Sequence, residues 1–308
     1  MKKFDDYLTT AKGDDRAYVD MPKLDTLWLN TGTLCNITCG NCYIESSPKN
    51  DALVYMTYAE VKAYLDEIRD EEMGTSEIGI TGGEPFMNPD IIEIIEECLG
   101  RGFNLVVLTN AMRPMMRHKD DILRIKEQYK ETFLLRISVD HFNPVMHEEE
   151  RGEGTWDIAL AGLKWLSDNQ FNINIAGRTR WGEKEEELRE GYTELFKTEN
   201  IQVDANDPMK LILFPEMDEN VEVPEITTDC WGILNIDPKE MMCSNSRMVV
   251  KRKGAAKPAV LACTLLPYED EFEFAATLKE SSDRVYLNHH SCAKFCVLGG
   301  GSCTVNAD

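Results

Sequence analysis

The sequence has no apolar run that approaches the roughly 18 residues required to cross a membrane. Its first residues, MKKFDDYLTT, also lack the apolar stretch of a secretory signal peptide. The two absences predict a cytoplasmic protein. In that reducing compartment we expect the ten cysteines to be metal ligands or core residues rather than disulfides.

Basic residues are also scarce, with 33 Lys and Arg against 55 Asp and Glu and a formal net charge of -22. Binding to nucleic acids or to anionic membranes depends on clustered Lys and Arg that neutralise phosphates. The composition therefore argues against both partners. The length of 308 residues is enough for one large domain or two unequal ones.

Three cysteines lie inside eight residues of the segment TLCNITCGNCYIE. Cys35, Cys39 and Cys42 follow a short apolar strand expected at 27–30. Three thiolates from one loop can hold three irons of a [4Fe–4S] cluster and leave the fourth iron open for another ligand. A zinc site completed by a distant residue and a set of ordinary loop cysteines are the alternatives.

Short apolar strands alternate with amphipathic helices from residue 27 to about residue 220. We expect strands at 27–30, 77–81, 105–110, 134–140, 173–180 and 210–216, and helices at 57–72, 88–100, 119–130, 155–168 and 183–198. Six β/α units in series predict an α/β fold with a parallel sheet, either an open doubly wound sheet or a partial barrel. In both, the carboxyl ends of the strands build the functional site.

The alternation stops near residue 220, and the remaining segment is rich in loops and cysteines. We therefore expect an N-terminal extension at 1–26, a core domain at 27–220 and a small C-terminal cysteine domain at 221–308. Six cysteines lie in this last segment: Cys230, Cys243, Cys263, Cys292, Cys296 and Cys303.

The cysteine loop, followed by Tyr43, and the run Gly82-Gly83-Glu84-Pro85 at the end of the next strand resemble the signature of the radical S-adenosylmethionine (SAM) superfamily. The resemblance covers residues 27–218 and implies a partial (β/α)6 barrel. It also implies a [4Fe–4S] cluster whose open iron binds SAM. Such enzymes cleave SAM reductively to a 5'-deoxyadenosyl radical that abstracts hydrogen from a substrate. The implied partner is an electron donor such as flavodoxin or ferredoxin.

The same resemblance implies roles for polar residues at the strand ends. Glu84 is expected to pair with the ammonium group of SAM, and Arg178 with its carboxylate. Asp140 and His141 are candidate catalytic residues, with His141 as a possible proton-transfer group. The full set expected to bind SAM is Tyr43, Gly82, Gly83, Glu84, Pro85, Asn110, Ser138 and Arg178.

The run from Asp140 through His147, Arg151-Gly152 and Gly154 to Trp156 is similar to a stretch of the peptide-modifying branch of this superfamily. That branch includes sulfatase maturases and enzymes that crosslink ribosomal peptides, so a peptide or protein substrate is expected. Two alternatives stay open. One is the oxidation or rearrangement of a small metabolite, as in twitch-type dehydrogenases or the molybdopterin pathway. The other is a non-catalytic iron–sulfur redox sensor.

The cysteine-rich tail resembles the auxiliary-cluster domains of the superfamily, which are called SPASM when they hold two clusters and twitch when they hold one. It lacks the C-x2-C-x5-C-x3-C run that is usual in SPASM domains. We therefore expect one auxiliary [4Fe–4S] cluster, with a structural zinc site as the alternative. The expected ligands are Cys243, Cys263, Cys292 and either Cys296 or Cys303.

Overall fold

The computed structural model describes residues 2–218 and 220–301. Eight strands form one sheet in the order β7-β6-β5-β4-β3-β2-β8-β9, and β1 and β10 form a separate pair. The strands are β1 Tyr18–Val19, β2 Thr26–Asn30, β3 Glu77–Thr81, β4 Asn104–Thr109, β5 Phe133–Ser138, β6 Asn172–Arg178, β7 Leu211–Phe214, β8 Ser246–Val250, β9 Ala259–Leu261 and β10 Val285–Tyr286. The helices are α1 Tyr58–Asp70, α2 Ile91–Gly100, α3 Arg113–Arg117, α4 Lys119–Tyr129, α5 Pro144–Arg151, α6 Trp156–Asp168, α7 Glu185–Thr198 and α8 Cys230–Leu234.

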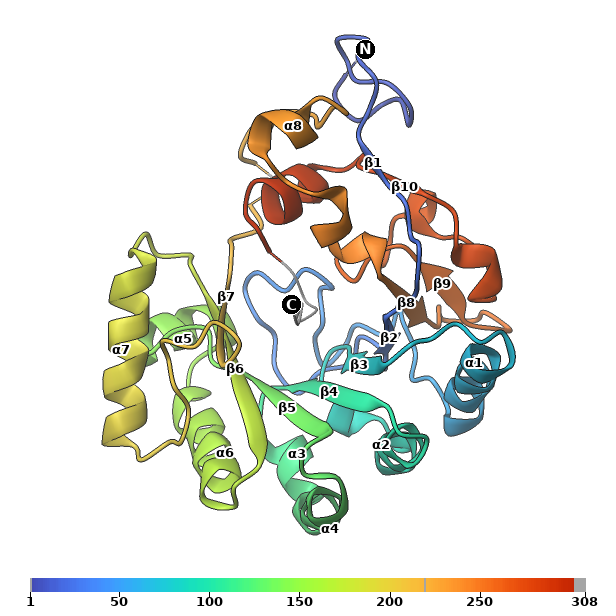
Figure 1. Cartoon of the computed structure of the whole chain (residues 1–308). Coiled ribbons are helices and arrows are strands. Elements are labelled where there is room, and N and C mark those ends of the chain that lie inside the picture. The colour runs from blue at the N-terminus through green and yellow to red at the C-terminus, as the bar shows by residue number, and fades with distance from the viewer. Residues whose placement is uncertain (1, 219, 302–308) are drawn as a thin grey trace.

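Strands β2 to β7 are parallel and lie side by side in chain order. The sheet curves around the loop that follows β2, and the helices between the strands cover its outer side (Figure 1). The α/β class and the parallel sheet of six β/α units are therefore confirmed. Within residues 2–218 and 220–301, the sheet is open between its edge strands β7 and β9.

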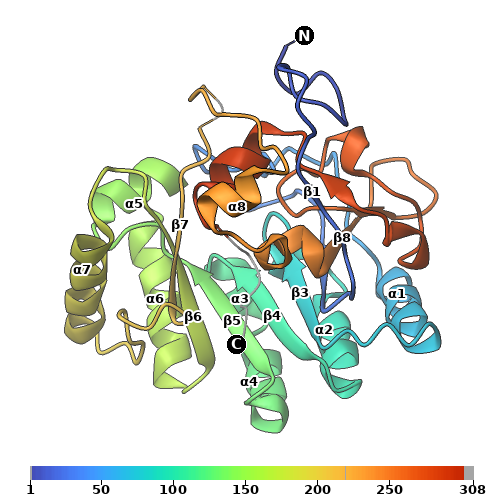
Figure 2. The ribbon, with the colours of Figure 1, turned by 45° about the horizontal axis from the view of Figure 1, so that its top comes forward.

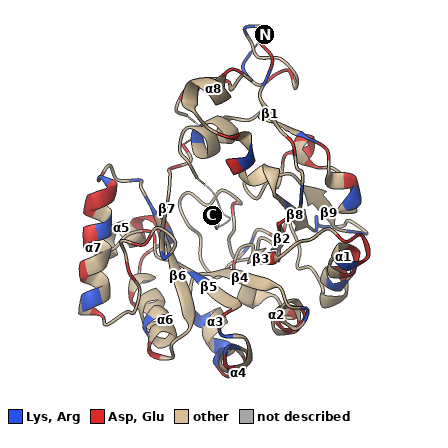
Figure 3. Ribbon diagram, viewed as in Figure 1, with Lys and Arg blue, Asp and Glu red and all other residues tan. Residues whose placement is uncertain are grey.

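The main core fills the space between this sheet and the outer helices. Helix α1 begins with the capping box that the sequence predicts, since Thr57 and Glu60 exchange hydrogen bonds between side chain and backbone. Its apolar face, Val61, Leu65 and Ile68, is buried as expected. Acidic residues lie on outer helices such as α7, away from this core (Figure 3).

Three helices, α3, α5 and α8, occupy segments for which the sequence pattern predicted none. Helix α5 is eight residues long and ends in a charged run, so it has no apolar stripe that periodicity could reveal. Helix α2 begins at Ile91 rather than at the predicted Asn88-Pro89. The reason is local, because the Asn88 side chain accepts a hydrogen bond from the Asp90 backbone N–H and forms a turn before the helix.

The cysteine-rich tail continues the main sheet, because β8 pairs in parallel with β2 and β9 pairs antiparallel with β8. All five residues of β8 are buried, so this strand lacks the alternation by which strands are recognised. The boundary at residue 220 stays a prediction.

A second core joins the two ends of the described chain. Ala17 and Val19 from the N-terminal segment pack with tail residues such as Val223 and Leu265, and β1 pairs with β10. Figures 1 and 2 show this N-terminal segment beside the tail, on one side of the main sheet. No helix in the described part of the chain is both long and apolar enough to cross a membrane.

Candidate active site

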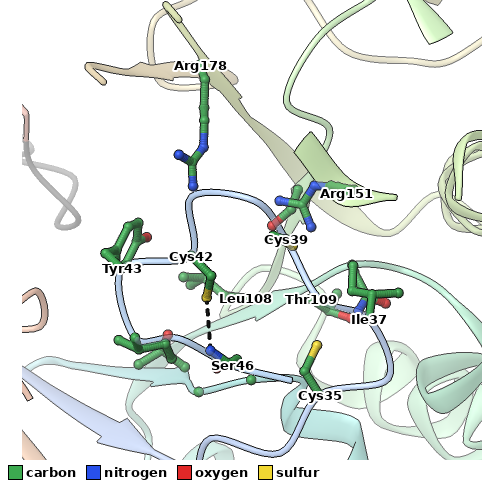
Figure 4. Close-up of a pocket in the computed structure, with 16 residues that line it drawn as sticks. Cys35, Ile37, Cys39, Cys42, Tyr43, Ser46, Leu108, Thr109, Arg151 and Arg178 are labelled. Atoms are coloured by element: carbon green, nitrogen blue, oxygen red, sulfur yellow. Dashed lines mark hydrogen bonds between the residues drawn. The ribbon is translucent and has the colours of Figure 1, made fainter. Parts of the chain in front are cut away.

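The cysteine loop follows β2 and lies at the centre of the curved sheet (Figure 1). Its three cysteines line one cavity, which encloses about 660 Å³ including its open mouth. Figure 4 shows Cys35, Cys39 and Cys42 around this space, with Ser46 donating its backbone N–H to Cys42 Sγ at 3.3 Å. Six of the eight residues expected to bind SAM also line this cavity: Tyr43, Gly82, Gly83, Asn110, Ser138 and Arg178.

The two glycines after β3 are required because the turn packs tightly against the start of the cysteine loop. A Cβ added at Gly83 would lie 2.3 Å from the Leu34 carbonyl oxygen, and one at Gly82 would lie 2.7 Å from that of Gly32. The backbone of Gly83 donates to Gly32 O at 2.8 Å, and that of Glu84 donates to Leu34 O at 3.1 Å. The turn therefore holds the loop in place as well as lining the cavity.

Glu84 and Pro85, the other two residues expected to bind SAM, are buried and do not line the cavity. The Glu84 carboxylate accepts hydrogen bonds from Thr109 Oγ1 and from the Asn110 backbone N–H, both at 2.9 Å. Burial raises the pKa of Glu84 to about 7 although these hydrogen bonds favour the charged form. Glu84 thus links the glycine turn to the end of β4, and its contact with the ammonium group of SAM stays a prediction.

Glu150, at the C-terminal end of α5, holds the middle of the cysteine loop by hydrogen bonds. The Gly40 backbone N–H donates to Glu150 O at 2.7 Å. The Asn41 backbone N–H and side-chain amide donate to the Glu150 carboxylate at 2.9 and 3.1 Å. Arg180 donates to the same carboxylate, whose side chain is fully buried. Sequence analysis missed Glu150, because nothing in the pattern HEEER distinguishes one acid from its neighbours.

Two arginines, Arg151 and Arg178, lie beside the cysteine loop and line the same cavity (Figure 4). Arg151 pairs with Asp140 at 2.7 Å, and Arg178 Nε lies 3.6 Å from the same carboxylate. Although burial raises the pKa of Asp140, the two arginines outweigh it and hold that pKa below its usual value. Arg151 was not among the expected site residues, but it lies in the run with which the sequence resembled peptide-modifying enzymes.

Arg178 is surrounded by groups that compensate its charge. Its guanidinium lies 3.8 Å from Glu150 and 3.9 Å from Glu216, and donates to Asn41 O at 3.3 Å. It also sits 5.9 Å from the centre of the Tyr43 ring. These neighbours compete with the expected contact to the carboxylate of SAM, which stays a prediction.

The two candidate catalytic residues are buried in different surroundings. Asp140 lines a second cavity that adjoins the first, whereas His141 lines neither cavity. The His141 ring accepts from the Asn143 backbone N–H at 2.9 Å and lies 3.3 Å from Glu183. Burial lowers the pKa of His141 below its ordinary value. This geometry gives His141 a packing role, and its role in proton transfer stays a prediction.

The donor set of the loop fits an iron–sulfur cluster. Among residues 2–218 and 220–301, no three His, Cys, Asp or Glu side chains converge on a position for a single metal ion. A cubane cluster has no such requirement, because each cysteine binds its own iron. Burial raises the pKa of Cys35 to about 12, so cluster binding has to displace the thiol proton. Three thiols spaced around one cavity meet these conditions.

The tail cysteines gather in the second core, where Cys292 is buried and Cys243, Cys263 and Cys296 pack against its apolar residues. The pKa of Cys292 is raised mainly by burial and further by the thiols of Cys263 and Cys243. Cys230 packs against the same apolar core. The remaining predicted ligand, Cys303, lies outside the described residues.

Residues 29–190 match the family model of the radical SAM superfamily. The chain belongs to this superfamily. The match begins within β2, includes the cysteine loop and the glycine turn, and ends within α7. Membership of this superfamily confirms the predicted enzyme class and its cofactors, a [4Fe–4S] cluster and SAM.

Curated relatives and solved structures resemble this radical SAM protein. The antilisterial bacteriocin subtilosin biosynthesis protein AlbA of Bacillus subtilis is 33% identical over 143 residues, which cover 46% of this chain and 30% of AlbA. An AdoMet-dependent heme synthase of Methanosarcina barkeri is 29% identical over 163 residues, covering 51% of this chain and 43% of the synthase. The matched part of the chain therefore spans less than half the length of either relative.

The solved structure of anSMEcpe with bound AdoMet superposes with a TM-score of 0.61 over 87% of this chain and 82% of its own. The two sequences are 14% identical. At that identity the likeness shows a shared fold and nothing more specific.

Proposed function

We propose that this radical SAM enzyme modifies a peptide or protein by removing hydrogen from an unactivated C–H bond. The observation that carries the proposal is the 33% identity to AlbA, a protein named for the biosynthesis of a bacteriocin. The similarity of residues 140–156 to peptide-modifying enzymes supports it, since Arg151 from this run lines the cavity with the three cysteines.

The loop cysteines would hold the cluster, and the remaining cavity wall would hold SAM. When bound and reduced, these cofactors supply a carbon-centred radical that takes a hydrogen atom from the substrate. Gly82 and Gly83, which line the cavity, would offer backbone carbonyls to the amino group of SAM, and Asn110 and Ser138 would offer polar side chains. Leu108 and the Tyr43 ring are apolar walls that would keep water from the reacting carbon. A flavodoxin or ferredoxin would supply the electron.

We also infer a partial (β/α)6 barrel, and one auxiliary [4Fe–4S] cluster within the tail. Its ligands would be Cys243, Cys263, Cys292 and either Cys296 or Cys303. The burial of Cys292 and the packing of Cys243 and Cys263 against the same apolar core support this inference. Soft thiolates also suit zinc, so the structural zinc site is the competing possibility.

Spectroscopy of a variant that lacks the three loop cysteines tests the auxiliary cluster. After anaerobic reconstitution we expect its Mössbauer and EPR spectra to retain a [4Fe–4S] signal. A folded variant that contains zinc and no iron would exclude the cluster and favour the zinc site.

The substrate class is tested by hydrogen transfer to 5'-deoxyadenosine. Cells grown in deuterated medium provide a peptide fraction and a small-molecule fraction in which every C–H bond is labelled. We expect the reduced, reconstituted enzyme to transfer deuterium from the peptide fraction. Transfer from the small-molecule fraction alone would refute a peptide substrate. It would favour a small metabolite, an alternative that the 29% identity to a heme synthase supports.

A further inference from the structure

Helix α8 is apolar, yet none of its residues is buried. It has the sequence CWGIL, and its residues Ile233 and Leu234 are 77% and 39% exposed. Apolar side chains that gather in water on one surface element mark a place where a partner covers them. Trp231, on the same helix, lines a groove that gives this apolar surface a defined shape.

The groove lies between α8 and the N-terminal segment and encloses about 840 Å³ including its open mouth. Its apolar wall consists of Tyr18, Pro22, Trp231 and Pro238, and we call it the tail groove. The tail groove and the cavity of the cysteine loop share no residue among those that the structure describes. Figures 1 and 2 both show α8 next to β1, on the tail side of the main sheet. The tail groove is therefore separate from the cofactor site.

The polar part of the tail groove is acidic. Asp20 and Asp237 line it together with Thr228 and Lys239. Asp20 also lines a neighbouring cavity of about 1160 Å³ including its open mouth, whose other charged residues are Glu271, Glu273, Glu280, Asp283 and Arg284. The groove and this cavity together present six carboxylates and two cations. That balance attracts a positively charged segment and repels an anionic one.

Arg284 shows how a guanidinium group is received at this place. Its guanidinium carbon lies 3.9 Å from the centre of the Tyr18 ring, and the group pairs with Asp20 at 3.1 Å. The side chains of Arg284 and Asp20 are 42% and 63% exposed. An exposed pair of this kind contributes little to stability, so a cation from a partner can join or replace Arg284 at small cost.

We propose that the tail groove docks a positively charged, extended peptide segment in which basic and apolar side chains alternate. The apolar side chains cover the rings of Tyr18 and Trp231, and the basic ones lie beside Asp20 and Asp237. Grooves lined by aromatic rings bind extended segments in this manner. The proposal rests on the proposed peptide-modifying function and assigns the groove to a part of the peptide that is remote from the reacting bond.

Fluorescence anisotropy of labelled, capped peptides tests the tail groove in the reconstituted, SAM-loaded enzyme. In the first probe arginine alternates with proline, which favours an extended backbone. Glutamate replaces arginine in the second probe, and glycine replaces proline in the third. We expect the first probe to bind at least about tenfold more tightly than either of the others, because the second lacks the positive charge and the third lacks the apolar contacts.

Two variants of the groove have matched controls elsewhere in the chain. Trp231→Ala should weaken binding of the first probe about tenfold, and Asp20→Asn about threefold. Trp165, on α6, is like Trp231 a partly buried tryptophan packed against a core. Asp70, on α1, is 63% exposed and paired with an arginine, as Asp20 is. Trp165→Ala and Asp70→Asn should therefore change the affinity by less than about twofold.

No binding of the first probe would overturn the docking site, as would equal binding of the second. Equal binding of the third probe, or equal losses in a variant and its control, would also overturn it. Those results would show only a non-specific attraction to the net charge of -22. A dimer that Trp231→Ala dissociates would assign the groove to a second copy of the chain and so refute a peptide occupant.

If Trp231→Ala fails to fold, Asp20→Lys decides the question. Reversal of the charge at this exposed residue should weaken the first probe at least about tenfold. Failure of the proposed function reads out separately. In that case the wild-type enzyme either forms no 5'-deoxyadenosine or takes deuterium only from small molecules, whatever the ranking of the probes.

Discussion

Removing the Glu150 carboxylate should loosen the cysteine loop before any cluster binds. This fully buried side chain accepts two hydrogen bonds from Asn41, at 2.9 and 3.1 Å, and one from Arg180. A hydrogen bond to a charged group contributes about 1.5–3 kcal/mol, and the contacts of one carboxylate are not additive. Glu150→Ala keeps the backbone bond from Gly40. We therefore expect local opening of the loop to become easier by about 3 kcal/mol, or about 100-fold in its equilibrium constant.

Amide hydrogen exchange of the ligand-free protein measures this opening without depending on the cofactors. Exchange in the peptide that contains Asn41 should accelerate about 100-fold in Glu150→Ala, while exchange in the strands of the core stays unchanged. Glu150→Gln keeps an acceptor for the Asn41 backbone N–H and should show a smaller effect. After reconstitution, Glu150→Ala should release iron to a chelator faster than the wild type.

Glu149→Ala is the matched control. Glu149 is the adjacent acid on α5, and its side chain contacts Trp181 and Arg180 rather than the cysteine loop. Its removal should leave loop exchange within about twofold of the wild type. Unchanged loop exchange in Glu150→Ala, or an equal acceleration in Glu149→Ala, would refute the argument that Glu150 holds the loop.

Three further predictions concern the cluster and two buried titratable groups. Replacing Cys35, Cys39 and Cys42 by Ala should remove about four irons per chain and abolish SAM cleavage, which iron analysis and product assays check; undiminished cleavage would contradict the cluster assignment. Because the pKa of Glu84 rises from 4.5 to about 7 on folding, the free energy of unfolding should fall by about 3 kcal/mol as pH rises across that window. Denaturant titrations should show this fall in the wild type and not in Glu84→Gln. If Glu84 meets the ammonium group of SAM, Glu84→Gln should also bind SAM about ten- to hundredfold more weakly than the wild type in a parallel titration. Burial lowers the pKa of the His147 ring from 6.5 to about 4. The free energy of unfolding of the wild type should therefore fall by about 3 kcal/mol as the pH falls between those values. Denaturant titrations should show this fall in the wild type and not in His147→Phe.

The sequence alone was sufficient to identify the central part of the site. Strand ends of a parallel sheet meet at one edge, so the cysteine loop after β2, the glycine turn after β3 and Asn110 after β4 could be placed together from their positions in the chain. The structure brings all three to one cavity. The capping box of α1 and the six β/α units were equally readable, because both depend on short-range patterns.

Tertiary structure decided which side chains face the cavity and which support it from behind. Glu84 turns inward to β4 and His141 packs beside Glu183, although both follow strand ends as Asn110 does. Glu150 reaches Asn41 across 109 residues of chain, and the Phe295 ring stacks on that of Phe214, which lies far from it in the sequence. Local sequence fixes the period of an element, but the direction of a buried side chain depends on the partners that distant segments supply. The sequence by itself therefore determined the fold class and the cofactor loop, and only the folded chain determined what holds that loop and which side chains face the cavity.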